Sequence, residues 1–222
     1  RHQVLRRYGV PGDRVHVVYN ACRLPASASA PKPAIDPQCE KTVLFLGRVT
    51  GQKGPEFFLA AAEKVLAETQ SVRFIVGGAG EGVESAVALA ARKGIGHRVL
   101  FTGFLRSGDI ERVFRLADLF VMPSQSEPFG LAALEAAGSG VPVILTRQSG
   151  AAEVLTHALK VDYGDVDGLK AAILRVLHDS ALAQRLREGA WSDVARLTWE
   201  ASAGQCLDIY HGLCGHLVTG QR

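Results

Sequence analysis

Short apolar strands alternate with amphipathic helices along most of this 222-residue chain. Continuous apolar runs such as TVLFLG (42–47) and LFVMPS (119–124) are typical of strands buried on both faces of a sheet. Helical patterns follow them, as in GPEFFLAAAEKVLAET (54–69), whose apolar side chains fall on one face. Strand and helix alternate about six times with short connections. This pattern predicts an α/β fold, a Rossmann-like doubly wound parallel sheet with helices on both faces.

The same pattern divides the chain into three parts. Residues 1–40 are expected to end in a linker, because residues 21–40 are rich in Pro, Ala and Ser. Residues 41–198 form the Rossmann-like domain, and residues 199–222 form a C-terminal helix. The only methionine is Met122, so the sequence does not begin at an initiator. Trimming of the N-terminus and a domain taken from a longer polypeptide both explain this, and we favour the second.

The overall composition argues against several classes of protein. A net charge of +3 does not indicate a surface for nucleic acid. Four cysteines in a chain of this length do not form a disulfide framework. No apolar run approaches the roughly 20 residues that a membrane span needs. We therefore expect a cytoplasmic protein that binds no nucleic acid and has no membrane span.

Ligands of doubly wound sheets bind beyond the carboxyl ends of the strands, where the βα loops gather. The first of these loops, GRVTGQKGPE (47–56), carries Arg48 and Lys53 among glycines that include Gly47. Glycine lets a backbone approach a ligand closely, and the helix start near Pro55 favours an anion. The two cations are candidates to grip a phosphate or diphosphate, although two solvated surface charges fit the same pattern.

The second loop, VGGAGEGVES (76–85), is only a loose match to the glycine fingerprint of dinucleotide-binding proteins. Val83 stands where the third glycine belongs, and no acidic residue is well placed to hold a ribose. Two interpretations stay open, a tight turn close to a ligand and a tight turn without one.

Two glutamates eight residues apart mark the segment that follows the strand at 119–124. Glu127 lies just before a predicted helix, and Glu135 lies in its second turn. The first N–H groups of this helix, at Phe129, Gly130 and Leu131, have no partners within it. A cap-region acid and a solvent-facing residue are the ordinary interpretations of the two glutamates. Because the helix is rich in alanine, we instead expect Glu135 to lie deeper and to need hydrogen-bond donors.

Hydroxyl groups supply donors of this kind. Ionised carboxylates only accept hydrogen bonds, so they suit the paired hydroxyls of a sugar or a ribose. A ligand with phosphates in the middle and hydroxyl-bearing rings at both ends would engage the cations and both glutamates. A nucleoside-diphosphate sugar has this layout.

With these motifs, the sequence resembles the C-terminal, donor-binding domain of a GT-B glycosyltransferase of glycosyltransferase family 4, the retaining "glycosyl transferases group 1". The resemblance covers nearly the whole chain. It rests on LGRVTGQKG (46–54), VGGAGEG (76–82), VLFTGFL (99–105) and SGAAEVL (149–155). EPFGLAALE (127–135) matches the family's signature of two glutamates separated by seven residues.

The resemblance implies a role for each residue of the site. Arg48, Lys53 and Glu127 would be the catalytic residues. The two cations would stabilise the leaving diphosphate in place of a metal, and Glu127 would bind hydroxyls of the donor sugar. Glu135 would bind the ribose. The other donor-binding residues would be Gly47, Leu105 against the base, and the amides of Phe129, Gly130 and Leu131.

The resemblance also implies the partners of the chain. The donor would be a nucleoside-diphosphate sugar, and no metal or other cofactor would be required. The acceptor site would come from an N-terminal GT-B domain that this chain lacks, with residues 1–40 next to the hinge. Alone, the chain would bind nucleotide and be poorly active as a hexosyltransferase. Peripheral membrane association is compatible with this arrangement.

Two other functions share the expected fold. One is a non-catalytic nucleotide-sugar-binding or scaffold domain, and the presence of Arg48, Lys53, Glu127 and Glu135 together argues against a decayed site. The other is a GT-B-fold sugar-nucleotide epimerase, and EPFGLAALE argues against it, because an epimerase would need different acids and histidines.

Two further patterns are explained by structure alone. Asp165 and Asp167 open a predicted helix, so we expect capping and no metal. Cys206 and Cys214 fall on an apolar helical stripe with Trp199, and we expect them in the core. Eight helical residues place the two thiols about 12 Å apart, too far for a disulfide or a shared metal.

Overall fold

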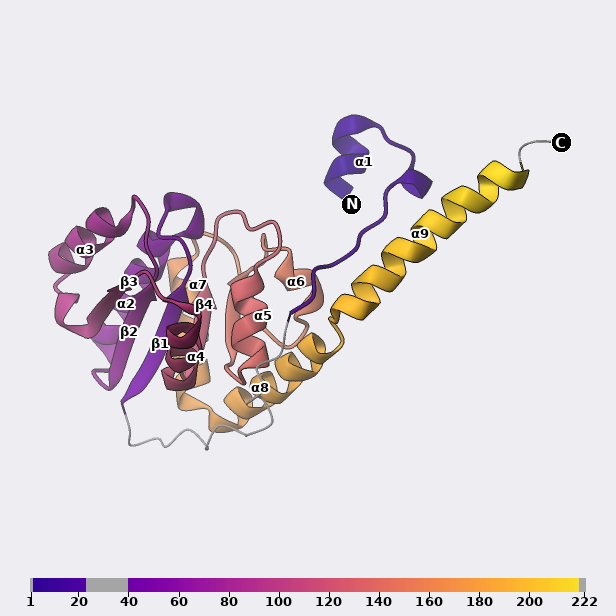
Figure 1. The fold of residues 1–222 in the computed structure, drawn as a ribbon. Helices are drawn as coiled ribbons and strands as arrows, with labels where there is room; N and C mark the ends of the chain where they lie inside the picture. The colour runs from indigo at the N-terminus through magenta and orange to yellow at the C-terminus, as the bar shows by residue number, and fades with distance from the viewer. Residues whose placement is uncertain (1, 23–39, 220–222) are drawn as a thin grey trace. The chain divides into compact units, whose positions relative to one another are not determined.

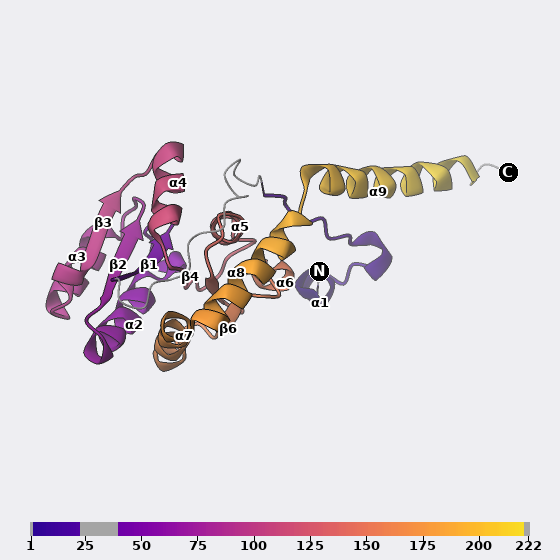
Figure 2. The same cartoon turned by 90° about the horizontal axis from the view of Figure 1, so that it is seen from below.

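The computed structural model describes residues 2–22 and 40–219, with side chains for 4–22 and 40–214. Most of the predicted linker, residues 23–39, lies outside the described residues. The chain divides into two compact units, each seen in Figures 1 and 2. The larger unit is Arg23–Ala195, and the smaller combines Arg1–Cys22 with Arg196–Arg222.

The larger unit is built on one six-stranded parallel sheet. The order of the strands is β3-β2-β1-β4-β5-β6, which is the order of a doubly wound Rossmann-like sheet. The prediction of this fold class is confirmed. The strands are β1 Lys41–Leu46, β2 Val72–Gly77, β3 Val99–Gly103, β4 Leu119–Met122, β5 Val143–Thr146 and β6 Leu159–Val161.

Helices cover both faces of the sheet. Helices α2, α3 and α7 lie on one face and α4 and α5 on the other, while α8 packs against α5 and α7 (Figure 2). Their bounds are α2 Pro55–Glu68, α3 Val83–Arg92, α4 Ser107–Leu116, α5 Leu131–Gly138, α6 Ala151–Val154, α7 Val166–His178 and α8 Ser180–Ala195. Short 3-10 helices span Gly51–Lys53 and Gly96–Arg98.

The apolar runs of the sequence form two layers of core, one on each face of the sheet. On the α2 side, Phe58 is fully buried and lies between Phe45 of β1 and Phe74 of β2, with ring centroids 5.7 and 5.6 Å apart. On the other side, Phe114 of α4 meets Phe120 of β4 edge to face. Burial on both faces explains why the strands read as continuous apolar runs.

The smaller unit contains α1 (His2–Tyr8), a 3-10 turn at Gly12–Arg14 and α9 (Trp199–Thr219). The N-terminal segment is tied to the start of α9 by two hydrogen bonds. Ser202 Oγ donates to the carbonyl of Tyr19 at 2.8 Å, and the amide of Cys22 donates to the carbonyl of Leu197 at 3.2 Å. None of the helices within the described residues has the length and apolar character needed to cross a bilayer.

The apolar stripe of α9 is not part of a core, which corrects the expectation for its cysteines. Cys206 is half-buried and Cys214 is exposed, as are Trp199, Leu207 and Tyr210. The stripe stays exposed because the described part of the smaller unit offers α9 only one short segment to pack against.

Candidate functional site

The site lies where the winding of the sheet reverses. Strands β1 and β4 are neighbours, with Val43 beside Leu119 and Leu44 beside Phe120, whereas β2 and β3 extend the sheet on one side and β5 and β6 on the other. The loops that follow β1 and β4 leave this point toward opposite faces, and the crevice between them is where such sheets bind ligands. Both loops carry residues that the sequence singled out.

The loop after β1 is held by the backbone of the loop after β2. The amide of Val49 donates to the carbonyl of Ala79, and the amide of Gly82 donates to the carbonyl of Val49, both at 3.0 Å. Gly78 has φ 130°, and a Cβ there would collide with the carbonyl of Gly47. The glycines of the second loop therefore serve the close packing of two loops, and the structure gives them this role without a ligand.

The loop after β4 is fastened to the loop after β1. The amide of Gln125 donates to the carbonyl of Gln52 at 2.9 Å, and Gln52 Nε2 donates to the carbonyl of Ser126 at 2.9 Å. Neither contact was predicted, since Gln52 and Ser126 lie 74 residues apart and Gln125 is adjacent to Ser126. The two loops meet only because β1 and β4 are neighbours in the sheet. The two loops therefore form one bridged edge.

A third loop, after β5, holds the backbone of Glu127. The amide of Gly150 donates to the Glu127 carbonyl at 2.9 Å, and residues 127 and 149 form an isolated parallel bridge. The buried Thr146 hydroxyl donates to the carbonyl of Ser124 at 2.6 Å and lies 3.1 Å from the Ser149 hydroxyl. This support was not predicted, although the polar Thr146 at the end of an otherwise apolar strand is a sequence signal for it.

Lys53 and Glu127 form an ion pair beyond the carboxyl ends of β1 and β4. The pair joins the loop after β1 to the loop after β4, and its side chains are only 21% and 12% exposed. The structure thus brings together two of the three residues predicted to be catalytic. Partial burial strengthens a pair of this kind relative to one on an open surface.

Arg48 is placed differently. Its side chain is exposed, and it makes no ion pair with any side chain in the described ranges 4–22 and 40–214. It stands beyond the carboxyl end of β1, one residue after Gly47. The guanidinium therefore keeps its full donor capacity for an anion.

Gly130 begins α5 in a conformation that other residues rarely adopt. Its φ is 107°, and a Cβ would lie 2.6 Å from Met122 Cε and 3.2 Å from Glu127 Cγ. No side chain caps this helix. The amide of Ala133 donates to the carbonyl of Gly130 at 3.0 Å. The two amides before it in α5, those of Leu131 and Ala132, lie in the first turn, where helical amides have no carbonyl partner inside the helix, and they can donate to a ligand.

Glu135 corrects one expectation. We expected it to be buried with its helix, but its side chain is exposed although Leu134 and Ala136 beside it are fully buried. A helix this short presents one face to solvent, and Glu135 occupies that face. Partial desolvation by the surrounding chain still raises its pKa above 4.5. None of the described cationic side chains pairs with this carboxylate, so burial leaves its charged form destabilised.

Leu105 lies near the same edge. It follows β3 and is half-buried, and a Cβ on Gly77 would lie 3.3 Å from Leu105 Cδ1 and 2.9 Å from Leu46 Cδ1. Leu105 therefore lies beside Gly77 at the carboxyl end of β2, on the side where Leu46 ends β1. An apolar side chain at this place can support a flat ring.

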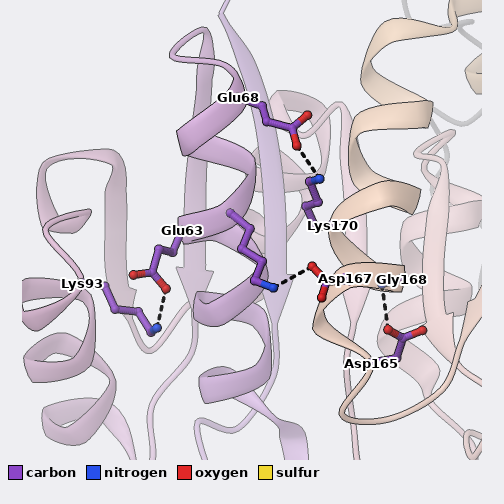
Figure 3. Close-up of polar contacts among 8 residues, drawn as sticks. Glu63, Glu68, Lys93, Asp165, Asp167, Gly168 and Lys170 are labelled. Atoms are coloured by element: carbon purple, nitrogen blue, oxygen red, sulfur yellow. Dashed lines mark hydrogen bonds and ion pairs between the residues drawn. The ribbon is translucent and has the colours of Figure 1, made fainter.

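The aspartates at the start of α7 have structural roles. Asp165 caps the helix by accepting a hydrogen bond from the amide of Gly168 at 2.8 Å, as predicted (Figure 3). Asp167 is paired with Lys64 of α2 at 2.6 Å, and this lysine lowers the pKa of the Asp167 carboxyl. Among the residues whose positions are described, no three His, Cys, Asp or Glu side chains are grouped to hold a metal ion.

Comparison with known proteins identifies the family. The model of "Glycosyl transferases group 1" matches residues 30–192. The chain belongs to this family. The sheet and its helices form the Rossmann-like domain of the GT-B fold.

Relatives and solved structures agree with this assignment. An uncharacterized glycosyltransferase of Methanocaldococcus jannaschii is 31% identical, over 77% of this chain and 45% of its own length. A D-inositol 3-phosphate glycosyltransferase of Nocardioides sp. is also 31% identical, over 94% of this chain and 50% of its own. A mutant of S. aureus TarM, solved with fondaparinux, α-GlcNAc-glycerol and UDP, has a TM-score of 0.83 at 20% identity and covers 95% of this chain and 42% of that one. The chain thus spans about half the length of the curated relatives it matches.

Proposed function

We propose that this chain is the donor-binding half of a retaining glycosyltransferase of glycosyltransferase family 4, which moves a sugar from a nucleoside-diphosphate sugar to an acceptor hydroxyl. One observation carries the proposal. Lys53 and Glu127, from two loops 74 residues apart in sequence, meet at the point where the sheet reverses its winding. Charged groups that converge in the crevice of such a sheet indicate a ligand there.

The diphosphate is the ligand group that suits the loop after β1. Lys53 and the exposed Arg48 supply two positive charges beyond the strand end, one a point charge and one a planar fork suited to phosphate oxygens. In the transfer, the bond between the sugar and the diphosphate breaks and its electron pair stays with the diphosphate oxygen. The two cations stabilise that developing charge, so no metal or other cofactor is required.

The hydroxyl-bearing ends of the donor suit the two glutamates. Glu127, held through its backbone by Gly150, accepts hydrogen bonds from the sugar, and the amides of Phe129, Gly130 and Leu131 bind the sugar and phosphate. Glu135 accepts from the ribose, because its carboxylate is partly desolvated and gains most from new donors. Leu105, at the ends of β1 and β2, lies against the base.

The remaining half of the reaction belongs to a part of the protein outside this chain. The match to about half of each relative supports a second, N-terminal domain that brings the acceptor. The acceptor oxygen forms the new bond on the face from which the diphosphate leaves, and its proton passes to the leaving group, so the anomeric configuration is kept. The isolated chain, a cytoplasmic hexosyltransferase half with at most peripheral membrane association, binds nucleotide and transfers sugar poorly.

Thermal unfolding of the chain with UDP, GDP, ADP and their sugars tests the proposal. A nucleotide bound only by the folded state at about 100 times its Kd adds about 2.7 kcal/mol to the free energy of unfolding. For a chain of this size that corresponds to a rise in Tm of roughly 5–10 °C. We expect one base to give such a shift, and no stabilisation by any of these compounds at millimolar concentration would contradict the proposal.

A further inference from the structure

The two groups of the Lys53–Glu127 ion pair have competing uses. As proposed above, Lys53 binds the diphosphate and Glu127 binds the sugar, yet in the structure each is the other's partner. A phosphate that binds the Lys53 ammonium group must either share this group with the Glu127 carboxylate or displace the carboxylate from it. The carboxylate is therefore a built-in competitor of the phosphate for one cation.

The backbones of both residues are held in place. The backbone of Glu127 is fixed by Gly150, and its Cγ packs against Gly130, where even a Cβ would come within 3.2 Å. Lys53 is the last residue of a 3-10 turn, and its own backbone amide donates to the carbonyl of Thr50 at 2.9 Å. Both side chains are largely shielded from solvent. A ligand phosphate at Lys53 accordingly lies close to the Glu127 carboxylate as well.

The effect of this carboxylate differs between the donor and the product. In the donor, the terminal phosphate is esterified, and the attached sugar offers hydroxyls that replace Lys53 as partners of Glu127. In the product, the sugar and its hydroxyls are gone, and the terminal phosphate carries additional negative charge. Glu127 then faces a like charge with no donor between them, which disfavours binding.

We propose that Glu127 is a specificity-determining residue that discriminates the nucleoside-diphosphate sugar from the free nucleoside diphosphate, and that re-formation of the Lys53–Glu127 pair promotes release of the product. This inference rests on the proposed function of the site. It adds a role for Glu127 after the transfer, in addition to its hydrogen bonds to the sugar.

Calorimetric titration of wild type and Glu127→Gln with UDP, GDP, ADP and their glucose or mannose derivatives tests this role. The amide keeps the shape of the side chain, removes its charge and frees Lys53. We expect Glu127→Gln to bind the free diphosphate about tenfold more tightly, a gain of about 1.4 kcal/mol, and to bind the matching nucleotide sugar no better than wild type.

A matched control is available on the surface of the same unit. Glu68 pairs with Lys170 between α2 and α7, so Glu68→Gln also removes one carboxylate from a lysine (Figure 3). It should leave both affinities unchanged, which separates the local effect from that of net charge. Glu127→Ala, which leaves the backbone contacts of residue 127 in place, is a second variant and should tighten the free diphosphate as well.

The outcomes distinguish this inference from the proposed function. If wild type binds none of the nucleotides, both are overturned. If wild type binds a nucleoside diphosphate, but neither Glu127→Gln nor Glu127→Ala binds it more tightly, the site stands and the discriminating role of Glu127 is wrong. An equal gain in Glu68→Gln would also overturn that role.

Discussion

Two regions of the larger unit contain ion pairs of the same chemistry in different settings. The Lys53–Glu127 pair joins two loops, and its side chains are 21% and 12% exposed. The Lys64–Asp167 and Lys170–Glu68 pairs join α2 to α7, and Lys64 and Asp167 are 46% and 76% exposed (Figure 3). The helix pairs lie over a packed apolar interface that does not depend on them. The loop pair lies beyond the carboxyl ends of β1 and β4, the place where sheets of this kind bind ligands.

The largest effect is expected when the stacked loops are disrupted. Gly78→Val places a side chain against the carbonyl of Gly47 in a conformation with φ 130° that valine cannot adopt without strain. We expect a loss of about 3 kcal/mol or more in the free energy of unfolding, together with loss of nucleotide binding. Gly108→Ala, where nothing lies within 4 Å, should keep both. Denaturant unfolding gives the comparison, and equal stability of the two variants would contradict the packing described for the loops.

Substitution of single cations should lower nucleotide affinity in the loop after β1 but not on the surface of α2. Arg48→Ala and Lys53→Ala each remove a charge-assisted hydrogen bond to phosphate, worth about 1.5–3 kcal/mol, so affinity should fall by roughly tenfold to a hundredfold. Lys64→Ala removes an equivalent charge from α2 and should leave affinity unchanged. Calorimetry with the nucleotide that stabilises wild type measures all three. Unchanged affinity in Arg48→Ala and Lys53→Ala would contradict the proposal that these two residues bind the diphosphate.

A smaller effect is expected at Glu135, whose carboxylate is proposed to bind the ribose but lowers the stability of the free chain. Its pKa is higher in the folded state than 4.5, so the unfolded chain loses this proton first as the pH rises, and the stability of wild type falls through that window. Glu135→Gln should therefore raise Tm slightly at pH 7, with no gain at pH 3, where the carboxyl is almost fully protonated in both states. Thermal scans at the two pH values check the sign. A lower Tm for the variant at pH 7 would show that Glu135 is stabilised by a partner.

The smallest effect on stability is expected for the Lys170–Glu68 ion pair on the surface of α2 and α7. A double-mutant cycle of Lys170→Gln and Glu68→Gln should give a coupling energy below about 1 kcal/mol that declines in high salt. Nucleotide affinity should not change in either variant. A coupling of several kcal/mol would make this pair as important as the one in the crevice and would remove the distinction between the regions.

The fold could be predicted because local patterns determine it. Runs such as VLFLG are buried on both faces, and the alternation with helices leaves few ways to connect parallel strands. The positions of Arg48, Lys53 and Glu127 at strand ends followed from the same patterns. Their pairing did not, because Lys53 meets Glu127 only when β1 and β4 are neighbours, and strand order is not written in any single segment.

Two expectations are wrong because a helical pattern does not determine the burial of individual side chains. Alanine-rich α5 is buried on most sides, as its composition indicated, but Glu135 lies on the remaining side. The apolar stripe of α9 predicts a core face, whereas Trp199, Leu207 and Tyr210 are exposed. Composition gives the average burial of a helix. The burial of one side chain depends on which neighbours the fold supplies.

Amide hydrogen exchange of the chain, with and without the nucleoside diphosphate that stabilises it, locates the ligand directly. We expect slower exchange in the loops after β1 and β4, at residues 47–54 and 125–132, and unchanged exchange on the outer surfaces of α2 and α7. Protection confined to α2 and α7, with both loops unaffected, would contradict a donor site at the reversal point of the sheet.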